Sequence, residues 1–142
     1  MARLCNVRLL RIVRESSMGQ AVVHFEISGD DPARLRSFYS ELFGWRVGAN
    51  RGAQHGPDYW LVQAEPSQSL RRTGIGGAIT TGPPGHPGRV VVYIEVPDIE
   101  SALVSAENLG GSRMFGPQSF NGVEIGLFRD PEGNMVGVLR PE

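Results

Sequence analysis

The stretch Ala21 to Val47, AVVHFEISGDDPARLRSFYSELFGWRV, decides the fold because it contains a strand, a helix start, a helix and a second strand. Side chains on a strand point alternately to its two faces. In the first part of the stretch every second residue is apolar: Val23, Phe25 and Ile27. These residues predict a face that packs on a helix. The ionisable residues between them, His24 and Glu26, are predicted to lie on the opposite face.

The helix that follows has clear start and stop signals. Asp30 or Asp31 can accept the first free backbone N–H groups, and Pro32 suits the first turn because proline has no N–H to leave unpaired. Gly44 is placed to end the helix. Apolar residues at the spacing i, i+3, i+4 and i+7 form a stripe: Leu35, Phe38, Tyr39 and Leu42. We expect this stripe to pack on the apolar face of the strand.

A weaker copy of this unit begins near Arg89, in the sequence RVVVYIEVPDIESALVSAENLGGSRMF. It has an alternating strand, an aspartate at the helix start and a glycine pair at the helix end. Its helix stripe consists of Ile99, Ala102, Leu103 and Ala106. Superposing the two units pairs His24 with Val91, and it pairs Glu26 with Tyr93. Such a repeat predicts two pseudo-symmetric halves whose polar strand faces line one shared cavity.

Shorter strands fill the rest of each half. They are alternating or apolar runs bounded by turn residues, at 46–47, 59–65, 74–80, 113–115, 122–128 and 135–139. The stretches 117–122 and 130–134 are predicted to be turns. Each half therefore has the order βαβββ. We expect a flexible extension at 1–18 and one domain at 19–142, with a first module at about 20–80, a linker at 80–89 and a second module at about 89–142.

Composition excludes several classes of protein. The 142 residues are 40% hydrophobic and 20% charged, which describes one globular domain. A net charge of −1 lacks the basic footprint of a nucleic-acid binder, and no apolar run approaches the roughly 20 residues that span a bilayer. The chain has no lysine, so it cannot use Schiff-base chemistry. Its only cysteine, Cys5, excludes an internal disulfide, and we expect a cytoplasmic protein.

Four segments together resemble the vicinal oxygen chelate (VOC) superfamily: HFEISGDDPARLRSFYSELFGW, GIGGAI, YIEVPDIESALVSAENLGG and DPEGNMVGVL. This superfamily includes glyoxalase I, extradiol dioxygenases, fosfomycin resistance enzymes and bleomycin-binding proteins. The resemblance covers about residues 20–140. It implies an α+β fold in which paired βαβββ modules form a curved, mostly antiparallel sheet around a small-molecule cavity. It also implies a homodimer, because many relatives pair this way.

Members of the superfamily that use a metal place one ligand on the first strand and one on the last strand of each half. The resemblance carries these positions over to His24, about Gly77, Val91 and Gly137. Only His24 can ligate, whereas a catalytic ion normally keeps three protein ligands. We therefore expect no metal and no other cofactor. Another set, formed by His24, Glu26 and Glu95, leaves a divalent ion open as an alternative.

Without a metal, the polar strand faces supply candidates for acid–base catalysis: His24, Glu26, Tyr93 and Glu95. A neighbouring carboxylate stabilises an imidazolium, while burial raises the pKa of a carboxyl group, so two such groups can take opposite proton roles. Tyr93 could donate a hydrogen bond to a developing oxyanion. The alternative is that His24 and Glu26 bond to each other in an inert cavity, with Tyr93 only filling volume.

Ligand-binding candidates come from aromatic residues, strand glycines and their neighbours. The set is Tyr59, Trp60, Gln63, Gly77, Val91, Phe115 and Gly137. Glycine in a strand often leaves room for a ligand. Trp45, Tyr59, Trp60, Phe115 and Phe120 could form a stacking wall for a planar ligand, or belong to the core. Arg89 and Arg113 could meet a ligand carboxylate, or simply be solvated.

These observations favour a metal-independent enzyme that performs isomerisation, elimination or cyclisation on a small molecule, such as a secondary metabolite. One alternative is a non-catalytic protein that binds a small molecule, such as an antibiotic. A second alternative is a metal-dependent enzyme of the glyoxalase or dioxygenase type. In each case the expected partner is a small-molecule ligand, with no nucleic acid and no membrane.

Overall fold

The computed structural model describes residues 19–52, 58–82, 88–120 and 122–142. The predicted extension at 1–18 and half of the predicted linker, residues 83–87, lie outside the described residues. Neither of the two described helices has the length and apolar character needed to cross a bilayer.

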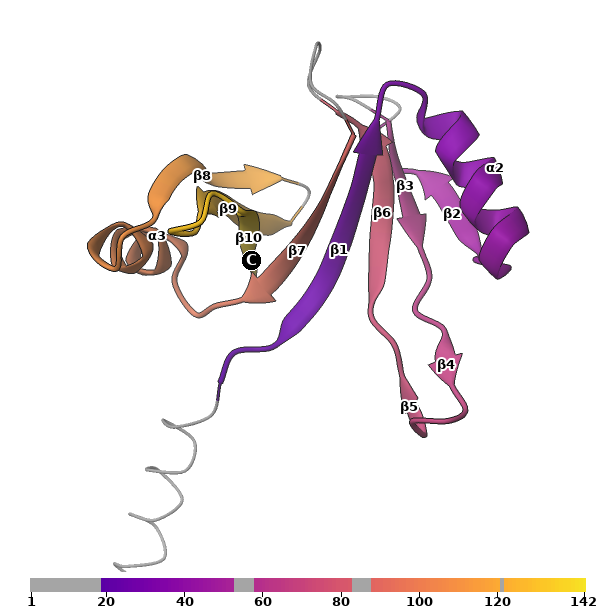
Figure 1. The fold of residues 1–142 in the computed structure, drawn as a ribbon, viewed down its shortest axis with the longest axis horizontal. Helices are drawn as coiled ribbons and strands as arrows, with labels where there is room; N and C mark the ends of the chain where they lie inside the picture. Colours follow the sequence, from indigo (N-terminus) through magenta and orange to yellow (C-terminus); the bar gives the residue numbers. More distant parts are fainter. Residues whose placement is uncertain (1–18, 53–57, 83–87, 121) are drawn as a thin grey trace, which may run out of the picture.

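The described chain folds as two βαβββ halves (Figure 1). The first half comprises β1 (Val22–Gly29), α2 (Pro32–Phe43), β2 (Val47–Asn50), β3 (Tyr59–Val62) and β6 (Gly76–Thr81). A small hairpin between β3 and β6, formed by β4 (Pro66–Ser67) and β5 (Arg72–Thr73), projects away from the sheet. The second half comprises β7 (Arg89–Glu95), α3 (Ile99–Asn108), β8 (Ser112–Phe120), β9 (Val123–Arg129) and β10 (Met135–Pro141).

Eight strands form one open sheet in the order β2-β3-β6-β1-β7-β10-β9-β8. The β1–β6 and β7–β10 pairs are parallel and the other five neighbouring pairs are antiparallel. Equivalent strands of the two halves follow in the same order from the two edges to the centre, where β1 lies next to β7. The two helices lie at opposite ends of the molecule (Figure 1). This confirms the predicted α+β class and the mostly antiparallel sheet.

The pairing of β1 with β7 gives the repeat its geometry. His24 lies opposite Tyr93, and Glu26 lies opposite Val91. Exchanging the two halves therefore places His24 where Val91 is, and Glu26 where Tyr93 is. This is the correspondence that the sequence repeat predicts. Since directly opposed residues share a face of the sheet, all four side chains lie on the same face.

Both helices begin at the aspartate caps and α2 ends at the glycine that the sequence indicates, while α3 ends at Asn108 with Leu109 as its C-cap, just before the glycine pair. The side chain of Asp31 accepts a hydrogen bond from the backbone N–H of Arg34 at 3.0 Å, which resolves the choice between Asp30 and Asp31. Gly44 ends α2 with a left-handed φ of +68°. In the second half, Asp98 caps α3 through the N–H of Ser101 at 2.7 Å.

The two helices differ in how well they pack. Ile99 and Leu103 of α3 are fully buried in a cluster with Val96 and Val138, as the stripe predicts. On α2, however, Phe38 and Leu42 are 56% and 57% exposed, so that half of the predicted stripe is wrong. Aromatic contacts replace it: Tyr39 stacks on Trp45, which in turn packs against Phe25.

The predicted turn at 117–122 is wrong for residues 117–120, although Gly122 does lie in a turn. Residues up to Phe120 continue β8, which is an edge strand. The pairing of β8 with β9 shifts register twice, between Arg113 and Phe115 and between Phe115 and Gln118. An edge strand tolerates proline because one of its sides has no strand to bond, and a bulge absorbs the misfit. Pro117 and Gly116 therefore mark an irregular strand here rather than a turn.

Two strand glycines make room for aromatic rings of the protein itself. A Cβ atom on Gly77 would lie 2.6 Å from the ring of Phe25, and one on Gly137 would overlap the ring of Tyr93. Tyr93 is only 5% exposed, so its ring cannot easily move aside. Any side chain at Gly137 would therefore displace Tyr93.

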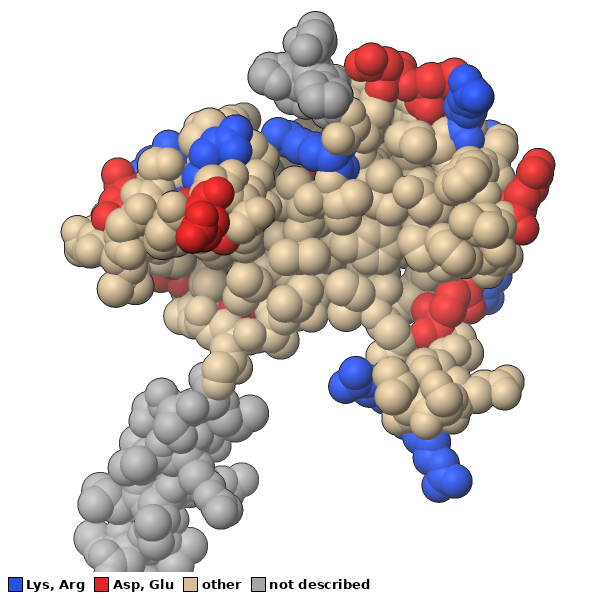
Figure 2. All heavy atoms as spheres, in the orientation of Figure 1, with Lys and Arg blue, Asp and Glu red and all other residues tan. Residues whose placement is uncertain are grey.

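Most charged side chains on the face seen in Figure 2 lie away from its centre. In the view of Figure 2, acidic and basic residues lie mostly around the rim, while the centre of this face is mostly uncharged. Surface ion pairs such as Arg46 with Glu65 and Arg113 with Glu100 lie on exposed side chains. Such exposed pairs add little to stability, so the fold depends mainly on apolar packing.

We predict that Leu103→Ala lowers the free energy of unfolding by about 2 to 5 kcal/mol, because it leaves a cavity in a closely packed cluster. Val104→Ala is the matched control, since Val104 is the next residue of α3 and is 41% exposed. Its effect should stay within about 0.5 kcal/mol. Urea unfolding of the two variants checks this, and equal losses would contradict the packing described for α3.

We predict that Gly137→Ala destabilises the protein by about 1 to 3 kcal/mol through overlap with Tyr93. The loss should largely disappear in a Tyr93→Ala background, because the ring that causes the overlap is gone. Gly48→Ala is the control, since its nearest contact would be an ordinary 3.7 Å. Unfolding measurements on the four members of the cycle check this. A Gly137→Ala loss that persists without the Tyr93 ring would disprove it.

Candidate functional site

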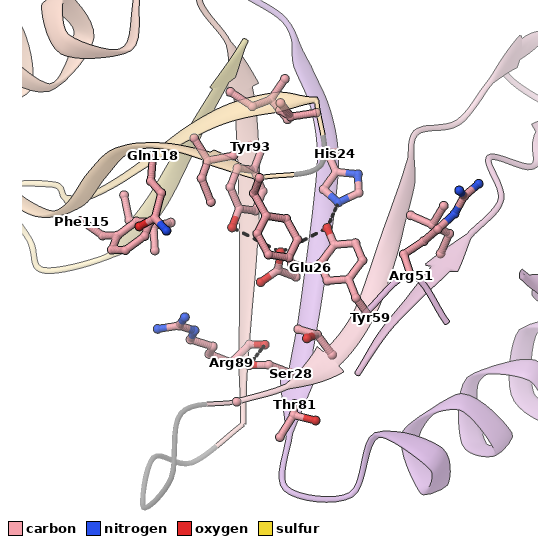
Figure 3. A pocket seen from close by; sticks show the side chains of 18 residues that line it. His24, Glu26, Ser28, Arg51, Tyr59, Thr81, Arg89, Tyr93, Phe115 and Gln118 are labelled. Carbon is pink, nitrogen blue, oxygen red and sulfur yellow. Dashed lines mark hydrogen bonds between the residues drawn. The ribbon is translucent and has the colours of Figure 1, made fainter. Parts of the chain in front are cut away.

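A cavity of about 1160 Å³ opens on the face of the sheet that carries His24 and Glu26 (Figure 3). Both halves of the chain line it. The first half contributes mainly polar groups, including the hydroxyl groups of Ser28 and Thr80. The second half contributes a mainly apolar wall: Phe115, Phe120, Val123, Ile125, Leu127 and Leu139. The cavity therefore suits a ligand with an apolar body and a polar end.

A hydrogen-bonded cluster lies in this cavity, with Glu26 at its centre. One carboxylate oxygen of Glu26, Oε2, accepts from the hydroxyl groups of Tyr59 and Tyr93, each at 3.3 Å. The Tyr59 oxygen also lies 2.8 Å from Nε2 of His24. A hydroxyl group has one proton, so when Tyr59 donates to Glu26 its oxygen accepts from Nε2–H of His24. Tyr59 thus connects the imidazole to the carboxylate.

Three strands bring the cluster together. His24 and Glu26 are two residues apart on β1 and so share its cavity face. Tyr93 lies on β7, directly opposite His24. Tyr59 lies on β3 and reaches the cluster across β6, which separates β3 from β1. The rings pack as well: Tyr59 stacks on His24 at 6.4 Å between centroids, and Tyr93 meets His24 edge-on at 5.7 Å.

Burial shifts the proton equilibria of these groups. It raises the pKa of Glu26 above its ordinary value, although hydrogen bonds from Tyr93 and Tyr59 and the charge of Arg89 oppose this shift. Burial also lowers the pKa of His24, which favours the neutral imidazole. The pKa values of Tyr59 and Tyr93 are raised, first by burial and then by the charge of Glu26, so both hydroxyl groups keep their protons. The cluster therefore combines a basic carboxylate with two fixed hydrogen-bond donors.

The structure places five of the predicted site residues at this cavity: His24, Glu26, Tyr59, Tyr93 and Phe115. Glu95, predicted to join the cluster, does not line the cavity and is exposed. The register of β1 against β7 shifts between Val22 and His24. Glu95 lies past this irregularity, at the end of β7, where its backbone N–H bonds to the carbonyl group of Ala21.

Two predicted ligand contacts on or after β3 lie elsewhere. Trp60 points to the opposite face of the sheet from Tyr59, and the guanidinium group of Arg36 on α2 lies 4.2 Å from its ring centre. Gln63 follows the end of β3 and is exposed. Neither lines the cavity. Strand alternation separates Trp60 from Tyr59, while Gln63 is too far along the chain to share the wall.

Three further predictions of ligand contact fail because protein atoms occupy the space. Gly77 and Gly137 accommodate the rings of Phe25 and Tyr93. Val91 shares the face of Glu26 but is only 1% exposed, and it does not reach the cavity surface. Gly77 and Gly137 thus make room for protein side chains and do not line the cavity.

Several lining residues were not among the predicted sites, notably Ser28, Arg51 and Gln118. Ser28 could have been found from the sequence, because it continues the alternation of His24 and Glu26 along β1. Arg51 and Gln118 have no such signal, since they lie beyond β2 and in the irregular part of β8.

The residues present do not fit a catalytic metal ion of the kind that the superfamily resemblance implies. Glu26 pairs with Ala78 and Tyr93 pairs with Gly137, so Ala78 and not Gly77 is the counterpart of Gly137. The four ligand positions are then His24, Ala78, Val91 and Gly137, and only His24 can ligate. The alternative set fails because Glu95 is outside the cavity. Within the described ranges, no cluster of three or more His, Cys, Asp or Glu residues could hold an ion.

Comparison with solved structures finds the same fold in several bacterial proteins. Methylmalonyl-CoA epimerase of Streptomyces coelicolor, in complex with 2-nitronate-propionyl-CoA, is 11% identical with a TM-score of 0.62, covering 85% of this chain and 94% of that one. The Mycobacterium tuberculosis methylmalonyl-CoA epimerase is 11% identical with a TM-score of 0.62, covering 85% and 87%. A hypothetical protein of Bacillus halodurans is 10% identical with a TM-score of 0.64, covering 88% and 96%.

Sequence comparison identifies the family. No curated protein matches the chain. The family model described as a glyoxalase-like domain matches residues 23–139, from the second residue of β1 into β10. Together with the paired βαβββ halves, this match shows that the chain belongs to the glyoxalase-like domain family, within the VOC superfamily.

Proposed function

We propose that this protein is a metal-independent enzyme that moves a proton on a small-molecule substrate, as an isomerase does, with Glu26 as the base. One observation carries the proposal. A carboxylate with a raised pKa lies in a large cavity, and one of its oxygens accepts hydrogen bonds from two tyrosine hydroxyl groups. Such a base is better matched to a weakly acidic C–H bond than a solvated carboxylate is, because proton transfer is most efficient when the pKa is near the working pH.

The cluster supports a complete proton-transfer step. Glu26 takes a proton from a carbon next to a carbonyl group, and the electron pair of the C–H bond moves onto the carbonyl oxygen. Once protonated, Glu26 no longer needs both hydrogen bonds. The hydroxyl group of Tyr93 is then free to donate to the new oxyanion, the role that fixed donors play in stabilising such charge. Return of the proton from Glu26 to a different carbon of the enolate, on the side that faces Glu26, completes an isomerisation and regenerates the carboxylate.

His24 extends the cluster through Tyr59. While Glu26 is ionised, Nε2–H of His24 donates to Tyr59. Once Glu26 is protonated, the relay uses the other neutral tautomer of His24, in which the proton is on Nδ1. Nε2 then accepts the proton of Tyr59, while Tyr59 receives one from Glu26. The net result is an imidazolium and a regenerated carboxylate. The 2.8 Å contact between Tyr59 and His24 is within hydrogen-bond range, while the 3.3 Å contact between Tyr59 and Glu26 has to shorten for this exchange. Glu26 and His24 thus act as one acid–base unit.

The comparisons support an isomerase over a lyase or a cyclase, since epimerisation is the named activity of several proteins with this fold. At 11% or 12% identity this likeness concerns the fold and does not carry over a substrate. The donor set around His24 supports chemistry without a metal. A protein that only binds its ligand is the competing proposal, and the first experiment separates the two.

We predict that the wild-type protein catalyses the exchange of solvent deuterium into at least one member of a panel of small carbonyl compounds. The panel includes methylmalonyl-CoA. Glu26→Gln should lower the exchange rate by about 100-fold or more, because the amide is not a base. Mass spectrometry of the compounds after incubation in D₂O measures this, and EDTA should leave the wild-type rate unchanged.

Glu41→Gln is the control, because Glu41 lies on the exposed side of α2 and its substitution by glutamine removes the same charge. Binding of panel compounds without exchange in wild-type protein would favour the binding protein instead. Loss of exchange on chelation would contradict the metal-independent mechanism.

We also predict that Glu26→Gln raises stability at neutral pH. Folding raises the pKa of Glu26 above 4.5, so the folded state disfavours the ionised form. The contribution of Glu26 to stability is therefore fully present below about pH 4.5 and is lost as the pH rises through the folded-state pKa. The advantage of the glutamine variant over wild type should grow across this range and then level off.

Urea unfolding between pH 4 and pH 8 measures this difference. Glu41→Gln should show no comparable trend. His24 has the opposite pH dependence: its contribution to stability is lost as the pH falls below 6.5, because burial lowers its pKa. Since His24 is present in all three proteins, this contribution largely cancels when they are compared. An advantage that shrinks with rising pH would show that the Glu26 carboxylate is stabilised by its surroundings.

A further inference from the structure

The charges around the cavity favour an anionic ligand. Among the described lining residues, Arg51 and Arg89 are cations and Glu26 is the one carboxylate. His24 is neutral when its pKa is lowered by burial. The lining therefore has a net positive charge even when Glu26 is ionised, and this charge attracts anions. The apolar wall of the second half adds a preference for a ligand with an apolar body.

Arg89 lies on the face of the sheet that carries His24 and Glu26. It is the first residue of β7 and pairs with Ser28, the next cavity residue of β1 after Glu26. The hydroxyl group of Ser28 donates to the carbonyl oxygen of Arg89 at 3.5 Å. Figure 3 shows the Arg89 side chain beside Ser28, on the other side of Glu26 from Arg51. A group held at Arg89 would therefore lie next to the base.

The guanidinium group of Arg89 lacks an acidic partner in the part of the chain that the structure describes. Its Nη1 donates to the thioether sulfur of Met135 at 3.1 Å, which is a weak acceptor, and its buried Nε has no acceptor there. Other arginines differ: Arg46, Arg113 and Arg140 each pair with a glutamate. A cation in a cavity with such poor protein partners is available to a ligand.

The other arginines that could bind an anion are less suitable. Arg113 donates to Glu100 and Glu107 and does not line the cavity. Arg51 lines the cavity but is exposed and follows the end of the short strand β2. Among the arginines that the structure describes, only Arg89 combines a place on the central strands with a position next to Glu26.

We propose that Arg89 binds a carboxylate group of the natural ligand, which is then a small organic acid with an apolar body. The planar guanidinium fork matches a carboxylate and forms strong charge-assisted hydrogen bonds with it. The body of the acid lies against the apolar wall on β8, β9 and β10, and a C–H bond near the carboxylate faces Glu26. The last point rests on the proposed function, whereas the binding of the acid at Arg89 does not.

Matched probes test this with the full chain. The probes are 2-naphthylacetate, its neutral amide and 2-naphthylmethyl phosphate, titrated into ¹⁵N-labelled protein and followed by chemical-shift changes. We expect the carboxylate to bind at least tenfold more tightly than the amide, since hydrogen bonds between charged groups contribute about 1.5 to 3 kcal/mol. Equal affinities in wild-type protein would overturn the inference without any variant, and so would tighter binding of the phosphate.

Variants locate the site. Arg89→Gln should abolish the preference for the carboxylate, and Arg89→Lys should keep only part of it, because an ammonium group retains the charge but not the fork. Arg51→Gln, which removes the other cavity cation, should keep the preference. Arg46→Gln is the control for net charge, as Arg46 lies on the surface in a pair with Glu65. Loss of the preference in Arg51→Gln, with retention in Arg89→Gln, would overturn the assignment.

The Glu26→Gln variant separates this inference from the proposed function. It should keep the preference for the carboxylate while losing deuterium exchange. A wild-type protein that prefers the carboxylate but exchanges no deuterium would overturn the enzyme and leave the acid-binding site. A protein that exchanges deuterium without preferring the carboxylate would overturn the acid-binding site and leave the enzyme.

Discussion

The antiparallel pairing of β1 with β7 is the constraint on which the rest of the structure depends. It joins the two halves into one sheet, and its register places His24 opposite Tyr93 and Glu26 opposite Val91. Because opposed residues share a face, this one register decides which side chains meet in the cavity. A slip of one residue would turn the polar face of either strand toward the helices. Fold and site thus depend on the same hydrogen-bond ladder.

Glu26 shows how the site balances two opposing effects. Burial disfavours its ionised form, while two tyrosine hydroxyl groups and the charge of Arg89 favour it. The result is a carboxylate that remains inside the protein without a direct ion pair among the described residues. Polar groups kept in this state lower the stability of the fold, and proteins retain them chiefly at functional sites. The same burial keeps Tyr59 and Tyr93 protonated, so that they remain donors.

The glycine at position 137 has two consequences: it cannot ligate a metal, and it leaves room for Tyr93. The superfamily resemblance assigns a ligand to this position, and a glycine there cannot ligate. Its missing side chain makes room for the ring of Tyr93, whose hydroxyl group bonds to Glu26. At this position the space of a ligand side chain is taken by an aromatic donor. The hydrogen-bonded cluster therefore includes His24 and the space beside Gly137, two of the positions that the superfamily resemblance assigns to metal ligands.

The sequence by itself determined the two βαβββ halves, the helix caps and the cavity face of His24 and Glu26, because alternation, capping and the repeat are local patterns. Tertiary structure alone decided which distant residues join them. Tyr59 lies 35 positions from His24 in the chain and reaches it across an intervening strand. Glu95 does not join the cavity, because it lies beyond a shift in the register of β1 against β7. Local periodicity gives the face of a strand, but not its neighbours or its irregularities, and these depend on pairing between segments far apart in the chain.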